Sequence, residues 1–441
     1  MNTSKIHDVI GVGFGPSNLA LAIALEEIAQ HSGKSLDALF IDKQLHYRWH
    51  GDTLSSQSEL QISFLKDLVS LRNPTSPYSF VNYLKQQDRL IDFINLGTFY
   101  PCRLEYNDYL GWVAERFADK AAYGEEVVRV EPELDNGIIH HLKLVSRTDG
   151  GQEQVRRARS VVISTGGSPK IPQLFAAFRD DPRVFHHSQY LSALKELPCS
   201  AGQPMRIAIV GSGQSAAEAF IDLNDSFPSV KVDMILRSTA LKPADDTPFV
   251  NDIFAPQYTD LVFQQAAPDR EKLIREYHNT NYSVVDPELL ERIYGVLYRQ
   301  KVARQFRHAV LCRQQVEQAL ASENGIELTL LDLATQQRRT HRYDAVILAT
   351  GYERQSHRRL LAPLQVYLPG LEVDRNYRAL ATAPLQAPVF LQGFCEATHG
   401  LSDTLLSVLP MRSEEIGTAL YEALNIPTAA KPSKASALAS A

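Results

Sequence analysis

The N-terminal part of the chain begins with an apolar run whose hydrophobic period changes at a glycine-rich turn. Val9, Ile10 and Val12 are β-branched, as in a strand that is buried in a parallel sheet. The apolar spacing of residues 19–25 instead predicts a helix. The turn between these two runs contains Gly11, Gly13, Gly15 and Pro16. The pattern therefore predicts a strand, a tight turn and a helix in that order.

This turn has the features of a site for a dinucleotide pyrophosphate. Gly11 allows the tight turn, Gly13 lets the backbone approach the pyrophosphate, and the following helix offers free N–H groups at its positive end. Pro16 stands where a third glycine is usual, and proline suits the first turn of a helix. The next apolar run, "ALFID", predicts a second strand that ends in Asp42. An acid at that point accepts hydrogen bonds from a ribose 2′-hydroxyl, as in sites for NAD or FAD.

The same pattern returns at residues 205–223, "MRIAIVGSGQSAAEAFIDL". The turn of this second motif contains Gly211, Gly213, Gln214 and Ser215. Ser215 suits a phosphate contact at the helix N-terminus, because the turn lacks the form of a nucleophile elbow. The following strand, "VDMILR", ends in Arg237 instead of an acid, and a positive group there favours the 2′-phosphate of NADP. Lys242 either assists Arg237 or is a solvated surface lysine.

Two such units, the first ending in an acid and the second in an arginine, indicate FAD in the first and NADPH in the second. Two further strands end in Thr-Gly, in "ARSVVISTGGSPKIP" and in "YDAVILATGYE". We expect the end of the second one, Thr350, Gly351 and Tyr352, to return to the flavin. These paired connectors fit an FAD domain that is interrupted by an inserted NADPH domain, with crossings near residues 166–172 and 338–350.

The sequence thus predicts an α/β fold with two Rossmann-like dinucleotide-binding domains. We place the FAD-binding domain at residues 1–170 and 339–425 and the NADPH-binding domain at 171–338. Residues 245–300 are rich in Asp, Asn, Pro and Tyr, and they predict a small substrate-binding insertion that reaches over the flavin. The low-complexity residues 426–441 predict a disordered tail.

An unusual lysine lies in the apolar stretch "QISFLKDLVSLRNPTS", residues 61–76. Drawn as a helix, the apolar residues cover more than half of the circumference, and Lys66 lies at the margin of that arc. A lysine is rarely buried without a partner, so the stretch raises the question of which negative group Lys66 meets.

Composition narrows the class of protein. The chain has 441 residues, of which 44% are hydrophobic and 22% charged, and its net charge is -6, which argues against nucleic acid or an anionic membrane as the main partner. The four cysteines are isolated and predict reduced thiols, and the histidine pairs at 140–141 and 186–187 lack a third ligand, so no metal is expected. No run reaches the length of a membrane span. We expect a soluble, cytoplasmic enzyme; a homo-oligomer is compatible with the sequence, which gives no oligomeric state.

Several motifs together resemble one family. No C-x-x-x-x-C follows the first turn, which excludes the disulfide reductases. The flavin turn with Pro16 is joined by five other motifs, namely "YRWHG", "LQISFLKDLVSLRNPTSPYSFVNYL", "GSGQSAAE", "HNTNYSVV" and "DAVILATGY". From about residue 6 to 425 the chain is similar to the microbial N-hydroxylating flavin monooxygenases, and within them to the L-ornithine N5-monooxygenases of the pyoverdine type.

The resemblance implies a reaction. NADPH reduces FAD, the reduced flavin adds O₂ to give a C4a-hydroperoxide, and bound NADP⁺ shields this species from water. The side-chain amine of L-ornithine takes the distal oxygen, giving N5-hydroxyornithine for hydroxamate siderophore biosynthesis. The amine must be neutral, although its pKa in solution is near that of lysine, about 10. No Asp, Glu or His base for this proton emerges from the sequence.

The resemblance also implies roles for residues in the matching motifs. Lys66 corresponds to the lysine that pairs with the substrate carboxylate, and Asn251 and Asn281 to the asparagines that hold the amino groups. Ser402 and Leu405 fall in the segment that closes over substrate and flavin. Asparagines in such contexts also act in turns and caps, so from the residues alone both roles stay open.

Three more residues are expected at the flavin. Gln61 matches the glutamine close to the reacting oxygen, and a structural amide hydrogen bond is its alternative role. Trp49 and His50 of "YRWHG" are expected to line the flavin pocket, although a tryptophan is also a common core residue. The resemblance assigns catalytic roles to Gln61 and Asn281.

Other functions remain open at this point. An L-lysine N6-hydroxylase differs by one methylene of substrate, which is worth only about 1–3 kcal/mol in a pocket. A diamine hydroxylase would leave Lys66 without a carboxylate, and a Baeyer–Villiger or general amine oxygenase need not share the contexts of Lys66 and Asn281. A flavin and NADPH redox protein that hydroxylates nothing would share only the two dinucleotide sites.

Overall fold

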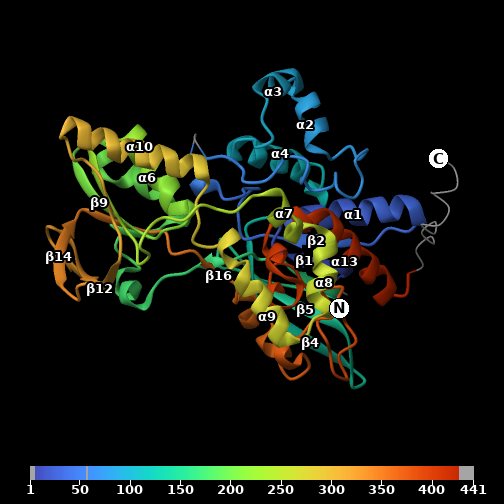
Figure 1. The fold of residues 1–441 in the computed structure, drawn as a ribbon. Helices are drawn as coiled ribbons and strands as arrows, with labels where there is room; N and C mark the ends of the chain where they lie inside the picture. Colours follow the sequence, from blue (N-terminus) through green and yellow to red (C-terminus); the bar gives the residue numbers. More distant parts are fainter. Residues whose placement is uncertain (1–4, 56–57, 427–441) are drawn as a thin grey trace.

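The structure, a computed structural model, describes residues 5–55 and 58–426, and it contains two units that lie side by side (Figure 1). The predicted fold class is confirmed, because each unit has a largely parallel sheet in which one strand, Ile6–Val12 or Met205–Val210, runs into a glycine turn and a helix. The tail predicted at residues 426–441 lies outside the described residues apart from Ile426.

The first unit is built on a sheet in which a parallel part continues into an antiparallel meander. In spatial order the strands are β3 (Ala121–Ala122), β2 (Ala38–Ile41), β1 (Ile6–Val12), β6 (Glu153–Ile163), β5 (Ile138–Thr148) and β4 (Glu125–Asp135). A late strand, β17 (Val389–Leu391), pairs in parallel with the end of β6. The chain therefore returns to this sheet after passing through the second unit.

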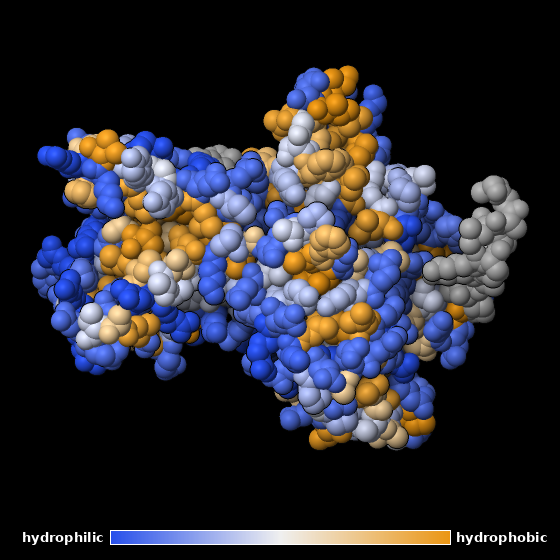
Figure 2. Space-filling model, in the orientation of Figure 1, coloured by the Kyte–Doolittle hydropathy of each residue, from blue (hydrophilic) through white to orange (hydrophobic). Residues whose placement is uncertain are grey.

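Helices cover the first sheet and extend beyond it. The glycine-turn helix α1 (Pro16–Ser32) packs against α13 (Leu409–Ala423) and α4 (Arg103–Glu115). The helices α2 (Phe80–Gln86) and α3 (Leu90–Leu96) project from the top of the view in Figure 1. The apolar side chains of Ile91, Ile94 and Leu96 on α3 are exposed. Figure 2 shows hydrophobic surface over the projecting pair of helices.

The second unit has an all-parallel sheet and a separate antiparallel sheet. The parallel strands in spatial order are β11 (Ala309–Leu311), β10 (Val230–Ile235), β9 (Met205–Val210), β15 (Ala345–Leu348) and β8 (Val184–His186). The antiparallel strands are β12 (Gln314–Ser322), β13 (Gly325–Asp332) and β14 (Arg338–Tyr343). The helices of this unit are α5 (Tyr190–Glu196), α6 (Gln214–Ser226) and α10 (Pro287–Ala303), and α6 packs against α10.

The insertion between β10 and α10 lies against the first unit. It contains α7 (Pro248–Asn251), α8 (Pro256–Gln264) and α9 (Ala267–Glu276), and the last two pack against α12 (Glu396–His399) of the first unit. The short helix α11 (Ser356–Leu360) follows the second connector. The segment that the sequence sets apart as an insertion thus reaches from one unit to the other (Figure 1).

The two connectors between the units lie beside each other. They form the antiparallel pair of β7 (Ser168–Pro169) and β16 (Tyr352–Glu353), in which Tyr352 is opposite Pro169. Gly167 allows this close approach, because a Cβ at that position would lie 2.9 Å from the Cβ of Tyr352. The strand β15, which lies beyond the division proposed at residue 338, pairs with β9 and β8 of the second unit. The domain boundaries themselves stay a prediction.

Residues 61–76, which the sequence allows to be drawn as a helix, do not form one. This stretch forms consecutive turns, and the next helix is α2, which begins at Phe80. The buried Asp67 organises the turns, because its carboxylate accepts hydrogen bonds from the backbone N–H groups of Val69 (2.9 Å), Ser70 (2.6 Å) and Phe80 (2.7 Å). An aspartate that bonds nearby backbone groups offers the chain an alternative to the helix. Lys66 consequently lies on a loop.

Within the described part of the chain, the structure contains no helix long and apolar enough to cross a membrane.

Candidate functional site

The first glycine turn has the geometry that a dinucleotide needs. Gly13 has φ of +86°, and a Cβ there would lie 2.5 Å from the carbonyl oxygen of Ser164. Gly15 faces open space within 4 Å, and it precedes a helix N-terminus that no side chain caps. The first N–H groups of α1 are therefore free to bind a pyrophosphate, so the residues present fit FAD at Gly11, Gly13, Gly15 and Pro16.

Two residues that the sequence analysis did not identify hold this turn. The Asn18 Nδ2 donates to the carbonyl oxygen of Gly13 (2.6 Å), and the Gln392 Nε2 donates to Asn18 Oδ1 (3.0 Å). Both side chains are buried. A buried asparagine inside a helix of apolar residues was the available signal for Asn18, whereas Gln392 follows β17 and is distant in sequence.

Asp42 lies directly after β2, as the sequence predicted. Its carboxylate oxygens accept hydrogen bonds from the backbone N–H groups of Phe14 (2.7 Å) and Gln44 (2.8 Å). These bonds join the acid to the glycine turn and fix its orientation. Each oxygen retains a lone pair for a ribose hydroxyl, so the residue fits the proposed role.

Aromatic side chains connect the "YRWHG" segment to the second connector. The ring of Trp49 packs edge-on against the rings of His50 and Tyr106, with centroids 4.9 Å and 5.7 Å apart. The His50 ring in turn packs edge-on against Tyr352, with centroids 6.4 Å apart. Desolvation by the surrounding protein, with Arg103 and Arg354 nearby, lowers the pKa of His50 to about 4, although His50 as a whole is an exposed residue. The imidazole is therefore neutral at pH 7.

The Thr-Gly ends of the connectors are tied to each other and to β8. The backbone N–H of Lys170 donates to the Gly351 carbonyl (2.9 Å), and Thr350 Oγ1 donates to the Lys170 carbonyl. His186 Nε2 contacts the same Gly351 carbonyl (3.0 Å), so this histidine has a structural hydrogen bond. Thr350, Gly351 and Tyr352 thus lie beside the first connector, and the Tyr352 ring lies near that of His50.

The second glycine turn has a comparable geometry. Gly211 has φ of +153°, and a Cβ there would lie 2.3 Å from the carbonyl oxygen of Ala349. Gly213 precedes α6, whose N-terminus also lacks a side-chain cap. Arg237 is exposed two residues after β10. These residues fit NADPH, with Arg237 at the position expected for the 2′-phosphate.

The Gln214 side chain takes part in a hydrogen-bond network within the protein. The Gln214 side chain accepts from the Asp286 backbone N–H (2.9 Å) and donates to Glu218 (2.9 Å). Glu218 in turn pairs with Arg103 of the first unit (2.9 Å). Gln214 therefore has a structural role in joining the units, and a cofactor contact by Gln214 or Ser215 stays a prediction.

The proposed substrate residues other than Lys66 and Gln61 lie on elements that meet. The turn after Asn251, residues 252–254, packs against residues 401–404, which contain Ser402. Tyr282, next to Asn281, donates to Glu396 (2.5 Å) and contacts Thr404 Oγ1 (3.4 Å). The segments that carry Asn251, Asn281, Ser402 and Leu405 are thereby brought to one place.

Lys66 is half-buried, and within residues 5–55 and 58–426 its ammonium group has no hydrogen-bond or ion-pair partner. Burial alone lowers its pKa. Its neighbour Asp67 is occupied by backbone N–H groups, and the Gln61 side chain is exposed. Among the described residues no hydrogen bond joins Lys66 or Gln61 to Asn251, Asn281 or Ser402.

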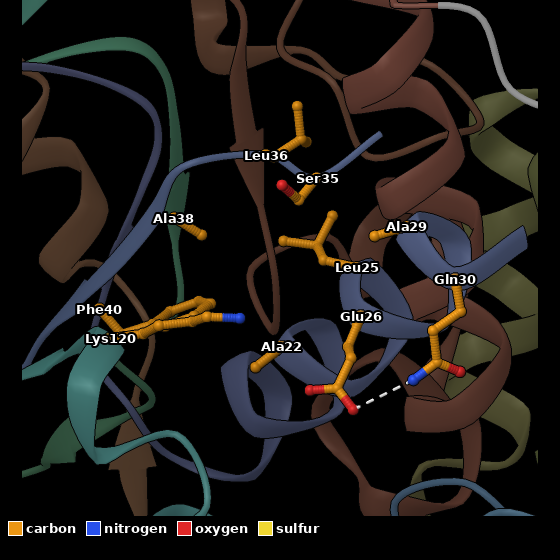
Figure 3. Close-up of a pocket in the computed structure, with 10 residues that line it drawn as sticks. All are labelled: Ala22, Leu25, Glu26, Ala29, Gln30, Ser35, Leu36, Ala38, Phe40 and Lys120. Atoms are coloured by element: carbon orange, nitrogen blue, oxygen red, sulfur yellow. Dashed lines mark hydrogen bonds between the residues drawn. The ribbon is translucent and has the colours of Figure 1, made fainter. Parts of the chain in front are cut away.

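A pocket elsewhere in the first unit involves none of these residues. It lies between α1 and the strand β2 (Figure 3). Glu26 and Gln30 on α1 line it on one side, and Phe40 and Lys120 on the other. In the described part of the chain, no three His, Cys, Asp or Glu side chains are grouped so as to hold a metal ion.

Comparisons with known proteins agree with this arrangement. A family model described as L-lysine 6-monooxygenase/L-ornithine 5-monooxygenase matches residues 5–354. The L-ornithine N(5)-monooxygenase of Pseudomonas aeruginosa is 62% identical over 438 residues, 99% of each chain. The structure of ornithine hydroxylase (PvdA) from P. aeruginosa matches with a TM-score of 0.92 at 61% identity, covering 95% of this chain and 100% of that one.

A more distant structure, the ornithine N-hydroxylase of Kutzneria sp. 744 with reduced FAD, NADP⁺ and L-ornithine, matches with a TM-score of 0.88 at 35% identity. It covers 95% of this chain and 99% of that one. Both the family model and the relatives extend over most of the sequence. The chain therefore belongs to the family of L-lysine 6-monooxygenases and L-ornithine 5-monooxygenases.

Proposed function

We propose that this chain catalyses the N5-hydroxylation of L-ornithine with NADPH and O₂, using bound FAD. The product is N5-hydroxyornithine for a hydroxamate siderophore, and the reaction takes place in the cytoplasm. The observation that carries the choice of an amino-acid substrate is the half-buried Lys66 ammonium, which has no anionic partner among the described residues. The identity of the relatives favours ornithine over lysine.

The carboxylate of the substrate is the partner that Lys66 lacks. Partial burial of an unpaired ammonium is unfavourable, and the lowered pKa of Lys66 has desolvation as its cause. A substrate carboxylate would remove that penalty and raise the pKa again. Only a ligand with a negative group at the correct distance from the Lys66 ammonium would remove this penalty, so only such a ligand would bind more tightly because of it.

The two asparagines supply polar groups for the amino ends of the substrate. Asn251 Nδ2 donates to the Asp246 carbonyl (2.6 Å), which leaves its Oδ1 as an acceptor. Asn281 is half-buried, and no hydrogen bond of its side chain is present among the described residues. An amide oxygen accepts an N–H of an amine while leaving the nitrogen lone pair free to react. Ser402 and Leu405 would close the site from the other side.

The bound cofactors supply the reducing equivalents and the activated oxygen. The protein binds and orients both cofactors. The glycine turns of the two units and the connectors fit FAD and NADPH, and Arg237 fits the 2′-phosphate of NADPH. Gln61 and the pair of Trp49 and His50 are proposed to contact the flavin. The neutral His50 would add no charge to the site.

The decisive experiment measures NADPH oxidation and hydroxylamine formation by the FAD-loaded chain, with L-ornithine, L-lysine or no amine. We expect hydroxylated product with ornithine, and a kcat/KM for lysine that is lower by roughly 10- to 100-fold, as one methylene allows. Hydrogen peroxide as the sole product with ornithine present would refute the proposed function. A preference for lysine would assign the second substrate of the family instead.

A further inference from the structure

Arg412, a buried arginine on α13, holds Asp403. Asp403 lies between Ser402 and Leu405 in the closure segment, the segment proposed to close over substrate and flavin. Arg412 is 2% exposed and Asp403 is 0% exposed. The Arg412 Nη1 lies 2.9 Å from Asp403 Oδ1 and also donates to the backbone carbonyl of Asp403. One guanidinium nitrogen therefore fixes both the side chain and the main chain of residue 403.

The other oxygen of the same carboxylate fixes the start of this segment. Asp403 Oδ2 accepts a hydrogen bond from the backbone N–H of Cys395 (2.7 Å), directly before α12. Residues 395–403 are thus closed into a compact loop by a single side chain. Ser402 precedes Asp403, and Leu405 follows two residues later, so the positions of both depend on this anchor.

The second guanidinium nitrogen reaches the flavin helix. Arg412 Nη2 donates to Ser17 Oγ (2.9 Å), in the first turn of α1 and next to Pro16. The Tyr377 ring lies 5.9 Å from the guanidinium carbon. One side chain therefore joins the closure segment to the end of α1 that is suited to the pyrophosphate.

Stability alone is a weak reason for such a pair. Desolvation of two buried charges offsets much of their attraction, and well-packed apolar residues of similar volume often stabilise a fold at least as well. A fork of directed N–H groups does, however, set relative positions better than apolar contacts do. The pair of Arg412 and Asp403 is thus suited to fixing geometry between two segments that bind different ligands.

We propose that Arg412 and Asp403 are positioning residues for the hydroxylation. They hold Ser402 and Leu405 in register with the flavin, so that the substrate amine lies where the oxygen is delivered. This inference rests on the function proposed above. Its consequence is that loosening the pair lowers the yield of hydroxylated product per NADPH and weakens ornithine binding, while NADPH binding and flavin reduction continue.

The test compares Arg412→Lys and Ser17→Ala with the matched control Arg375→Lys in the FAD-loaded chain. Arg375 also pairs with α13, through Glu415 (3.0 Å), and with Asp260 of α8 (2.6 Å), but its side chain makes no hydrogen bond to residues 395–403 within the described part of the chain. For Arg412→Lys we expect the KM for ornithine to rise roughly tenfold, as for the loss of one charge-assisted hydrogen bond. The yield of hydroxylated product per NADPH should fall, and hydrogen peroxide should account for the difference. Ser17→Ala should change both quantities in the same direction by roughly two- to threefold, as for the loss of a weaker hydrogen bond.

Several outcomes would overturn the inference. If Arg412→Lys, like the control Arg375→Lys, lowers only the melting temperature and leaves the ornithine KM and the product yield as in the wild type, then Arg412 and Asp403 are merely structural. If Arg412→Lys fails to fold, Ser17→Ala decides, because unchanged ornithine KM and yield in that variant refute the link to α1. A wild-type chain that hydroxylates no ornithine would refute the proposed function, which is a separate result.

Discussion

The replacement of Lys66 by methionine tests the central assignment of the substrate site. Methionine has a similar length and no charge, so the change removes the ammonium group without opening a large cavity. Because the lysine is half-buried, its pairing with a substrate carboxylate is screened only in part, and we assign it roughly 2–4 kcal/mol. We therefore expect kcat/KM for ornithine to fall by roughly 30- to 900-fold.

The fold should tolerate this change. Burial lowers the pKa of Lys66 in the folded chain, so the charged form is destabilised there relative to the unfolded chain. That penalty is fully present at pH values below the folded pKa and disappears as the pH rises above the unfolded value. At neutral pH, Lys66→Met should leave the melting temperature unchanged or raise it, and the FAD content should be that of the wild type.

The assay uses 1,4-diaminobutane as a matched substrate, since it has an amine at the same distance but no carboxylate. Hydroxylamine formation is measured for both enzymes with both substrates. If Lys66 binds the carboxylate, Lys66→Met loses activity with ornithine and almost none with the diamine. An equal loss with both substrates, or a loss of FAD, would refute the reasoning and make Lys66 a structural residue.

Three further predictions concern the cofactor sites and the response to pH. Asp42→Asn removes the charge that holds the Phe14 N–H, and it should raise the dissociation constant of FAD roughly tenfold in a fluorescence titration; unchanged affinity would exclude Asp42 from the FAD site. Arg237→Gln should raise the KM for NADPH roughly 10- to 100-fold and leave that for NADH unchanged, whereas an equal effect on both would contradict a 2′-phosphate contact. Burial lowers the pKa of His399 to about 4. The neutral His399 therefore contributes to the free energy of unfolding above pH 6.5, and this contribution is lost towards pH 4. Between pH 7 and 4.5 the free energy of unfolding should fall by roughly 2 kcal/mol less in His399→Gln than in the wild type, as measured by urea titration.

The parts of the fold that were predictable are those where local geometry demands one residue type. Gly13 and Gly211 adopt positive φ with a carbonyl oxygen where a Cβ would be, so the glycine spacing in the sequence reports the turns directly. Asp42 and Arg237 follow strands, whose apolar runs are also local signals. The family resemblance read from these motifs and the α/β fold are confirmed, and the names of the relatives agree with the predicted function and cofactors.

The parts that were missed depend on contacts between distant segments. Asn18 and Gln392 are 374 positions apart, and Arg412 and Ser17 are 395 apart, so no local pattern pairs them. Residues 61–76 show another limit of local patterns, because a helical hydrophobic period is also compatible with a loop whose backbone N–H groups bond to Asp67. The roles of the individual site residues stay predictions, which the variants above test.

The paired connectors also constrain how this chain reaches its native state. The strand β17 completes the first sheet by pairing with β6, and the whole second unit lies between them in sequence. Closing a loop of roughly 220 disordered residues costs on the order of 5 kcal/mol in chain entropy. If the second unit folds first, the antiparallel pair of β7 and β16 shortens the open loop to roughly 40 residues and lowers that cost by roughly 1.5 kcal/mol. The second unit, once folded, then favours the folding of the first unit. A variant that weakens the pairing of β7 and β16 should therefore slow refolding of the first unit more than it lowers the stability of that unit.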